Sequence, residues 1–386
     1  MPVGKEQVLA ALAKVPSPGG AALTDARVLS DIVVTDGKVF FSITVDAAAV
    51  KAWEPVRNAA EAAVRAIPGV QSALVALTAE RAAGAATRGP NPAHVATQPR
   101  AAGAPSGHAH AHPADRVQPG IPGVDAVIAV ASGKGGVGKS TTAVNLALGL
   151  RDLGLKVGML DADIYGPSLP KLLAIKEKPQ TVGGTRLKPI DRYGLSVMSI
   201  GFLIDEETPM IWRGPMVMSA ITQMLREVEW GKLDVMVVDM PPGTGDAQLT
   251  MAQQVPLKGA VIVSTPQDLA LIDARRGVAM FKRVNVPVLG IVENMSYFLC
   301  PHCGERSDIF AHGGAHAEAD HLGVPFLGEV PLDSVIRATS DAGSPVMVSE
   351  PDGARAAIFR AIAANVMASL ADEARASRQP PRIVIE

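Results

Sequence analysis

Residues 133–141 of this protein read Gly133-Lys134-Gly135-Gly136-Val137-Gly138-Lys139-Ser140-Thr141. This stretch follows an apolar run over residues 126–131 and opens a helical pattern, which is the strand-to-helix context that the GxxxxGK(S/T) pattern requires. Its glycines let the backbone wrap closely, so that successive N–H groups and the positive end of the helix converge on phosphate oxygens. The stretch therefore predicts a nucleotide site within an α/β fold.

Three polar residues of this stretch predict how ATP is held. Lys139 would neutralise the β and γ phosphates, and the hydroxyl of Ser140 would ligate Mg²⁺. Lys134 is a second cation that the pattern does not require, and it is either part of the phosphate site or a solvated surface lysine. Because phosphoryl transfer is catalysed by positioning and by neutralising charge, we predict that both lysines are catalytic.

Carboxylates follow two apolar runs of the same region. Asp239 ends the run 235–238, and a carboxylate at this edge of a sheet can hold Mg²⁺ directly or through water. Asp161 and Asp163 follow the run 157–160 in the same way. We predict that Asp163 orients the attacking water, whereas Asp161 and Asp246 are equally well explained as helix caps.

Short apolar runs alternate with helical segments over residues 123–374, which is typical of βαβ units around a parallel sheet buried on both faces. The predicted strands span residues 126–131, 157–160, 195–200, 235–238, 260–263, 288–292 and 326–327. A helix over residues 354–374 closes this region. We therefore expect a three-layer α/β domain with a mainly parallel sheet.

Residues 1–80 predict a separate, small α+β domain. Helical patterns cover residues 5–15 and 50–66, and strand-like runs cover residues 28–34, 39–45 and 73–77. Asp36-Gly37 between the first two runs is a hairpin signal, because glycine tolerates the positive φ of such turns.

Residues 81–122 are rich in Ala, Gly, Pro, Thr and His and have no hydrophobic period, so we predict a flexible linker. Its histidines, His108, His110 and His112, are better explained as part of a solvated spacer than as a metal site. Residues 375–386 form a predicted tail that contains no basic amphipathic helix for a membrane surface.

The composition excludes several classes of protein. Hydrophobic residues make up 48% of the 386 residues and charged ones 19%, which excludes wholesale disorder. The net charge of −2 offers no global attraction to nucleic acid or to an anionic membrane. No apolar run long enough to span a bilayer and no export signal are evident, so we predict a cytoplasmic protein.

The order of the two lysines in the phosphate loop resembles the deviant Walker A motif of the ParA/MinD class of dimeric ATPases. In that class the early lysine, here Lys134, reaches across the dimer to the phosphates of the partner. Four further strings narrow the match: Asp161-Ala-Asp163-Ile-Tyr-Gly-Pro-Ser168, Trp212-Arg-Gly-Pro-Met216, Asp239-Met-Pro-Pro-Gly-Thr-Gly-Asp246 and Asn294-Met-Ser-Tyr-Phe-Leu-Cys-Pro-His-Cys-Gly304. Together they resemble the Mrp/ApbC-type iron–sulfur cluster carrier ATPases over residues 121–370, and residues 1–80 resemble the DUF59-type domain often fused to them.

The resemblance implies phosphate binding by Gly133 to Thr141, Mg²⁺ binding by Ser140 with help from Asp239, and water positioning by Asp163. Asn294 matches the position that contacts the adenine ring. The sequence departs from the pattern in one place: the DUF59-type domain often has a cysteine near the start of its second helix, and residues 46–50 contain none. For that domain we expect contacts with partners rather than cluster handling.

Cys300 and Cys303 are the only cysteines of the chain, so a disulfide framework is excluded. They lie in a CxxC string, close enough to bind one metal centre, but an iron–sulfur cubane or a structural zinc requires four ligands. A two-fold axis would bring the pair from each of two copies together in a Cys₄ site. We therefore predict a 4Fe-4S cluster that bridges a homodimer.

Three other interpretations of the cysteine pair stay open. Zinc could be completed within one chain by His302, His312 or His316, although no recognised partner spacing is present. The pair could catalyse thiol redox chemistry, or it could be an inert loop.

Taken together, these features predict an ATP-binding iron–sulfur cluster carrier that delivers its cluster to apo iron–sulfur proteins and works with a cluster-assembly scaffold. Slow ATP hydrolysis would act as a conformational switch, and we expect neither nucleic acid nor membrane as partner. The main alternative is a ParA/MinD-like positioning ATPase that acts on DNA or membrane. A third possibility is an ATP-binding adaptor that carries no cluster.

Overall fold

The structure is a computed structural model that describes residues 4–26, 28–30, 32–35, 37–46, 49–70, 72–80, 120–183, 186–203 and 214–376. These residues form two compact units, one within residues 1–117 and one within residues 118–386, and each unit is described by itself. The predicted linker up to residue 119 with its three histidines, the pair Trp212-Arg213 and residues 377–386 lie outside the described residues. The exact domain boundaries therefore stay a prediction.

The first unit is a three-stranded sheet of order β1-β2-β3 with two helices. Its elements are α1 (Lys5–Leu12), β1 (Val33–Thr35), β2 (Lys38–Asp46), α2 (Val50–Arg65) and β3 (Ser72–Glu80). Strand β1 pairs antiparallel with β2, and β2 pairs parallel with β3 through the crossover helix α2. The predicted α+β order is confirmed, and apolar residues of α1, α2 and the sheet form its core.

The predicted strand over residues 28–34 is wrong in its extent. Only Val33–Thr35 form β1, which a tight turn joins to β2, with Gly37 at φ +76°. Further upstream, the hydroxyl of Ser30 accepts the N–H of Ser42 at 2.8 Å, so a side chain takes a bond that a ladder would give to the backbone. Because a side-chain oxygen takes the place of a backbone carbonyl, the regular strand pairing is interrupted, and Leu29 forms only an isolated bridge to Ile43.

The second unit is built on an eight-stranded sheet of order β15-β12-β11-β4-β10-β5-β9-β8. Its strands are β4 (Val124–Ala131), β5 (Val157–Asp161), β8 (Ile190–Arg192), β9 (Leu195–Ser199), β10 (Leu233–Asp239), β11 (Gly259–Ser264), β12 (Val288–Asn294) and β15 (Phe326–Val330). All neighbours pair parallel except β8, which runs antiparallel to β9. The seven predicted strands are thus confirmed, and β8 is an addition.

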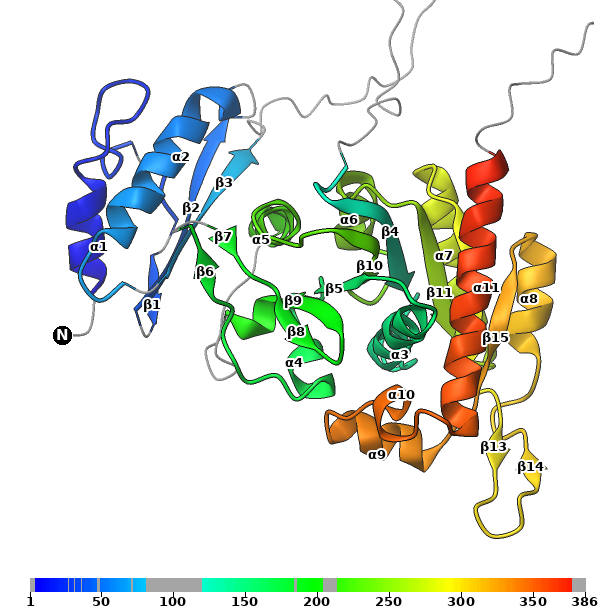
Figure 1. Ribbon diagram of the computed structural model, residues 1–386. Helices are drawn as coiled ribbons and strands as arrows, with labels where there is room; N and C mark the ends of the chain where they lie inside the picture. The colour runs from blue at the N-terminus through cyan, green and yellow to red at the C-terminus, as the bar shows by residue number, and fades with distance from the viewer. Residues whose placement is uncertain are drawn as a thin grey trace, which may run out of the picture. The chain divides into compact units, whose positions relative to one another are not determined.

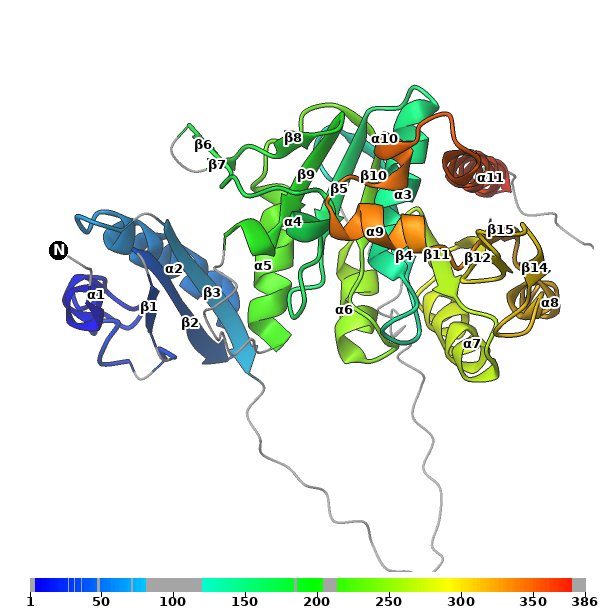
Figure 2. The ribbon, with the colours of Figure 1, turned by 90° about the horizontal axis from the view of Figure 1, so that it is seen from below.

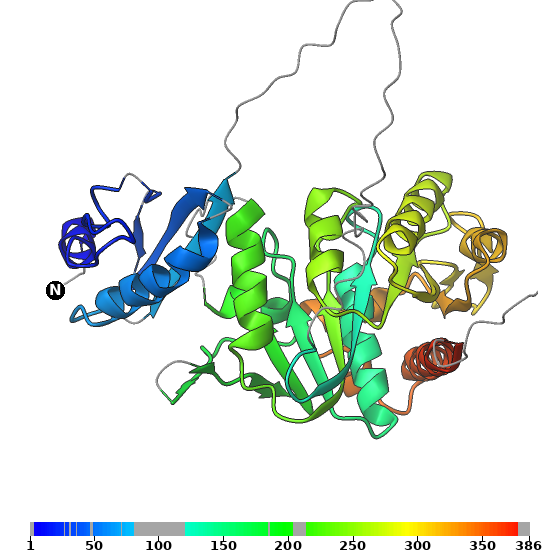
Figure 3. The ribbon, with the colours of Figure 1, turned by 90° about the horizontal axis from the view of Figure 1, so that it is seen from above.

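Helices cover both faces of this sheet and complete the predicted three layers. They are α3 (Lys139–Asp152), α4 (Leu169–Leu172), α5 (Gly214–Arg226), α6 (Asp246–Gln254), α7 (Asp268–Arg283), α8 (Gly314–Leu322), α9 (Ser334–Asp341), α10 (Val346–Ser349) and α11 (Ala354–Ala376). Helices α5, α6 and α7 lie in a row on one face, whereas α3 and α11 pack together on the other (Figures 2 and 3). Because both faces are covered, the strands carry nearly continuous apolar runs.

Helix α11 is, within the described residues, the one helix long and apolar enough to cross a membrane by length and composition. Its buried residues include Phe359, Ile362 and Val366, and the helix packs against α3, β12 and β15. One face of α11 therefore packs on the second unit, while the rest of the helix stays exposed or half-buried.

The register of the central strands brings acidic residues together at one edge. Asp239 at the end of β10 is the Cα partner of Asp161 at the end of β5 and of Val130 on β4. The phosphate loop leaves β4 at this same edge before α3 begins. The strand order reverses at β4, which lies between β11 and β10. This topology predicts a ligand site at the carboxyl ends of the strands beside β4.

Candidate functional site

The phosphate loop bends sharply into α3. Gly138, which precedes the first residue of α3, has φ +79°, and a Cβ added there would lie 2.2 Å from Nδ2 of Asn294. Glycine is therefore required for both conformation and space. The loop is fastened by two further bonds: the Ser132 hydroxyl donates to the carbonyl of Lys134 at 2.9 Å, and the N–H of Gly243 donates to the carbonyl of Ser132 at 3.0 Å.

Lys139 and Asp239 form a buried ion pair beneath the loop. The Nζ atom of Lys139 lies 2.6 Å from Oδ1 of Asp239, and the two side chains are 7% and 0% exposed. The same Nζ donates to the Ser140 hydroxyl at 3.3 Å. The other oxygen of Asp239, Oδ2, accepts no hydrogen bond from the described residues although it is buried. A buried carboxylate oxygen without a donor requires a cation or water, so Asp239 and Ser140 fit the predicted Mg²⁺ site.

Asp161 is the most heavily hydrogen-bonded carboxylate of the site. Its oxygens accept the Ser199 hydroxyl at 3.0 Å and the backbone N–H groups of Asp163, Ser168 and Leu169 at 3.2, 3.0 and 3.1 Å. Burial, and then the negative charge of Asp239, raise its pKa to about 7. Asp161 thus holds the loop of residues 162–169 in shape, and from the end of β5 it also satisfies the N–H groups of Ser168 and Leu169 where α4 begins.

Asp163 lies half-buried at the rim of the same site. Burial raises the pKa of its carboxyl group, while the positive charge of Lys139 acts in the opposite direction. Asp163 therefore lies close enough to Lys139 and Asp239 for both charges to affect it, and its role in positioning water stays a prediction. Lys134 is half-buried in the loop, and Asp246 begins α6, with a side chain outside the described part.

Asn294 lies at the end of β12 and contacts the phosphate loop directly. Its Nδ2 donates to the carbonyl of Val137 at 2.8 Å, and the side chain is only 8% exposed. This bond links the loop to the strand that leads toward the cysteines, a support role that sequence reasoning missed. The predicted contact of Asn294 with an adenine ring stays a prediction.

The two cysteines lie on a short hairpin that projects beyond the sheet, formed by β13 (Phe298–Leu299) and β14 (Arg306–Ser307) (Figure 1). The N–H of Cys300 donates to the carbonyl of Glu305 at 2.9 Å, and the N–H of Gly304 donates to the carbonyl of Cys300 at 2.8 Å. Cys300 is half-buried and Cys303 is exposed, and both are free thiols. The turn therefore presents both sulfur atoms from one tip.

Backbone hydrogen bonds from Cys303 and then His302 lower the pKa of the Cys300 thiol. A lowered pKa favours the thiolate, which is the form that binds iron. Among the described residues, the one group of three metal-ligating side chains whose ligand atoms gather closely contains His312 but neither cysteine. His316 instead packs edge-on against the Phe326 ring. The histidines proposed to complete a zinc site within one chain are thus engaged elsewhere, except the exposed His302.

Comparisons with known proteins agree with this geometry. Residues 123–367 match the family described as NUBPL iron-transfer P-loop NTPase, and residues 5–75 match the family described as iron–sulfur cluster assembly protein. The chain is 53% identical over 270 residues to the iron–sulfur cluster transfer protein NUBPL of Dictyostelium discoideum, which covers 68% of this chain and 84% of that protein.

Two further relatives support the same assignment. The iron–sulfur cluster carrier protein of Escherichia coli (strain K12) is 54% identical over 254 residues, which are 66% of this chain and 69% of the relative. A solved nucleotide-binding protein from Archaeoglobus fulgidus in complex with ADP shares 41% identity with a TM-score of 0.54, covering 62% of this chain and 93% of that one. The chain therefore belongs to the NUBPL iron-transfer family of P-loop NTPases, which confirms the resemblance drawn from its motifs.

Proposed function

We propose that this protein is an ATP-dependent iron–sulfur cluster carrier that holds its cluster between two copies of the chain. Cys300 and Cys303 of each copy supply two thiolates, which together make the four ligands of a 4Fe-4S cluster. The cluster is the cargo, and apo iron–sulfur proteins receive it. The cluster-assembly scaffold that would load the carrier, and the cytoplasm as its place of action, belong to the same proposal.

The observation that carries the proposal is the position of the cysteine pair. Both thiols lie at the tip of a projecting turn, and the neighbouring Leu299 is 48% exposed. An exposed tip with two thiols and an apolar neighbour can pack against a second copy of the chain, which would supply the other two ligands. A cluster held at such a surface is also easier to hand over than one enclosed by a single chain.

The nucleotide site supplies the switch. Phosphates of ATP would draw Lys139 from Asp239 and free that carboxylate for Mg²⁺ held with Ser140. Asp163 then positions the attacking water, and Lys134 contributes a further positive charge toward the phosphates of the second copy.

A continuous path connects the switch to the cargo. Asn294 bonds to Val137 of the phosphate loop, and the chain continues from Asn294 directly into β13, which ends beside Cys300. A change of the loop on ATP binding or hydrolysis would therefore reach the hairpin through one strand end. Such a path can bias the hairpin between holding and releasing the cluster.

The test is anaerobic reconstitution of the full chain and of the Cys300→Ala/Cys303→Ala variant, followed by measurement of iron and sulfide per chain. The proposal predicts loading of the natural protein and none of the variant. Ser307→Ala is a matched control, because Ser307 lies on the same hairpin and is exposed. Equal loading of natural protein and double variant would exclude the assignment.

Sedimentation with liposomes and with DNA in the presence of ATP separates this function from a positioning ATPase. A cluster carrier without such partners stays in the supernatant. Strong co-sedimentation with either would instead support the ParA/MinD-like alternative.

A further inference from the structure

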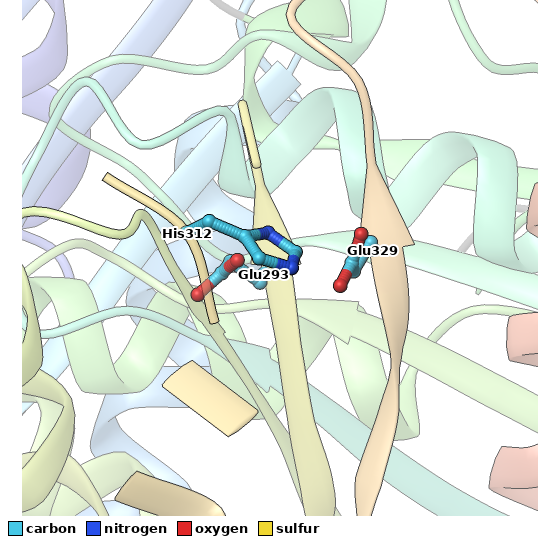
Figure 4. A group of neighbouring side chains, drawn as sticks. All are labelled: Glu293, His312 and Glu329. Atoms are coloured by element: carbon cyan, nitrogen blue, oxygen red, sulfur yellow. The ribbon is translucent and has the colours of Figure 1, made fainter. Parts of the chain in front are cut away.

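A cluster of three metal-ligating side chains, Glu293, His312 and Glu329, lies outside the nucleotide site and the cysteine pair. The ligand atoms of these residues lie within 4.8 Å of one another. Figure 4 shows the three side chains converging, with the imidazole of His312 between the two carboxylates in this view. Glu293 comes from β12, Glu329 from β15, and His312 from the segment between β14 and α8.

Strand register explains why the two carboxylates meet. Glu293 and Glu329 are Cα partners in the parallel pair β12–β15, so their side chains leave the same face of the sheet. Like charges directly opposite on neighbouring strands are destabilising, and a cation is needed to offset them. The nearest one here is Arg306, whose Nη2 lies 3.5 Å from Oε2 of Glu329.

Arg306 is held equally well from its other side. Its Nε lies 3.1 Å from Oδ1 of Asp308, and its guanidinium carbon lies 4.2 Å from the centre of the Tyr297 ring. Arg306 can therefore leave Glu329 while keeping its contacts with Asp308 and Tyr297. Its Nη2 also lies 2.7 Å from Nδ1 of His312. The same Nη2 lies 3.4 Å from Nε2, so the guanidinium and a metal ion would compete for the imidazole of His312.

Glu293 is oriented as buried metal ligands are. It is 0% exposed, its Oε1 accepts the Ser296 hydroxyl at 2.6 Å, and its Oε2 accepts the N–H of Ala315 at 2.6 Å. These bonds fix the carboxylate and leave each oxygen a further lone pair. Two carboxylates and one imidazole together form a donor set that a divalent cation can use.

We infer that Glu293, His312 and Glu329 form a mononuclear binding site for a divalent transition metal ion, distinct from the cysteine pair. Two carboxylate oxygens and one imidazole nitrogen suit ions such as Fe²⁺, Co²⁺ or Zn²⁺, with water completing the shell. Arg306 acts as the competing cation, and metal binding moves it fully onto Asp308 and Tyr297. Arg306 pairs with Leu299 in the β13–β14 hairpin, next to Cys300. A movement of Arg306 on metal binding would therefore reach the turn that carries the cysteines.

The test uses Co²⁺ as the probe and the full-length Cys300→Ala/Cys303→Ala protein without nucleotide, so that thiols do not contribute. Equilibrium dialysis gives stoichiometry and affinity, and visible absorption reports the coordination of the ion. We expect one Co²⁺ per chain at this site. Adding Glu329→Gln or His312→Gln weakens its binding by at least about tenfold. Any Co²⁺ held at the nucleotide site persists in every variant and is subtracted.

Arg306→Gln sharpens the test, because removing the competing guanidinium tightens Co²⁺ binding if the site is real. Arg337→Gln, on an exposed arginine of α9 paired with Asp341, is the matched control and leaves affinity unchanged. Both His312 and Arg306 are exposed enough for their variants to fold, which circular dichroism verifies. The inference is overturned if the affinity is the same in Glu329→Gln and His312→Gln as in the parent, or if Arg306→Gln does not tighten it.

Discussion

The phosphate loop and the cysteine hairpin differ in how much of each site one chain supplies. Around the loop, Lys139, Asp161 and Asp239 are buried and held by several bonds from three strand ends. At the hairpin, Cys303 is exposed and two strands of two residues each carry the turn. The first site is largely built within one chain, whereas the second, under the proposed function, supplies two of the four ligands of a shared cluster.

Substitutions at the two sites should therefore have different effects. Substitutions at the loop act on the folded chain itself, because they remove charges and bonds from a dry interior. If the proposed function holds, substitutions at the hairpin should act mainly on the cluster that two chains share.

Lys139→Ala should have the largest effect, on both nucleotide and fold. It removes the cation that meets the phosphates and leaves Asp239 unpaired beside Asp161, so we expect a loss of stability of about 3 kcal/mol. ATP affinity should fall at least about 100-fold, since roughly 3 kcal/mol of binding free energy corresponds to that factor. Urea unfolding and nucleotide titration measure both. Lys134→Ala is the control, and it should change stability by no more than about 0.5 kcal/mol.

Asp161 should make the stability of the nucleotide-free protein depend on pH. Its folded pKa is about 7, whereas the usual value is 3.8, so the folded state binds more protons between these limits. Its contribution to the unfolding free energy is therefore present at low pH and is lost as the pH rises from about 4 toward about 7.

Urea unfolding of natural protein and Asp161→Asn at several pH values checks this, with the exposed Asp191→Asn as control. The unfolding free energy of the natural protein minus that of Asp161→Asn should fall as the pH rises toward about 7 and then stay constant. A difference that stays constant from pH 4 to pH 8 would show that Asp161 titrates normally.

Asn294→Ala should have a moderate effect on stability and a specific one on nucleotide binding. The Val137 carbonyl loses its donor, which costs about 1–2 kcal/mol, and the loop loses its link to β12. Asn365→Ala is a matched control, because the Asn365 amide makes a similar 2.9 Å bond to the carbonyl of Leu327 far from the loop. Both should lower stability, but only Asn294→Ala should weaken ATP binding, by about tenfold. Equal ATP affinity in the two variants would exclude the proposed link.

Cys300→Ala/Cys303→Ala should have the smallest effect on the single chain. The thiols lie at an exposed tip, so we expect the unfolding free energy to change by no more than about 0.5 kcal/mol and ATP affinity to stay the same. A drop of several kcal/mol in the unfolding free energy would mean that the cysteine pair stabilises the folded chain. It would contradict the prediction that the hairpin tip contributes little to the stability of one chain.

Much of the fold could be predicted because its signals are local. The phosphate loop, the apolar runs of the parallel strands and the carboxylates that end β5 and β10 each lie within a few consecutive residues. The carboxyl ends of parallel strands meet at one edge, so the sequence alone predicts that Asp163, Asp239 and Lys139 lie together. The short strand β8 escaped detection because Ile190–Arg192 has no run of apolar residues to mark it.

What could not be predicted depends on strand order and register. Asp161 meets Asp239 because β5 and β10 are neighbours, and Glu293 meets Glu329 because β12 and β15 are. Apolar runs do not specify which strands pair. The bond between Asn294 and Val137 joins residues 157 positions apart, which no local pattern marks. The hydrogen bond from the Ser42 N–H to the Ser30 hydroxyl likewise interrupts the strand that the apolar residues of 28–34 predict.

The most direct test of the shared cluster is native mass spectrometry of the anaerobically reconstituted protein, with iron and sulfide determined on the same sample. The account predicts a species with the mass of two chains plus one 4Fe-4S cluster, and cluster-free chains when that dimer is separated. A single chain that retains four iron and four sulfide would contradict it.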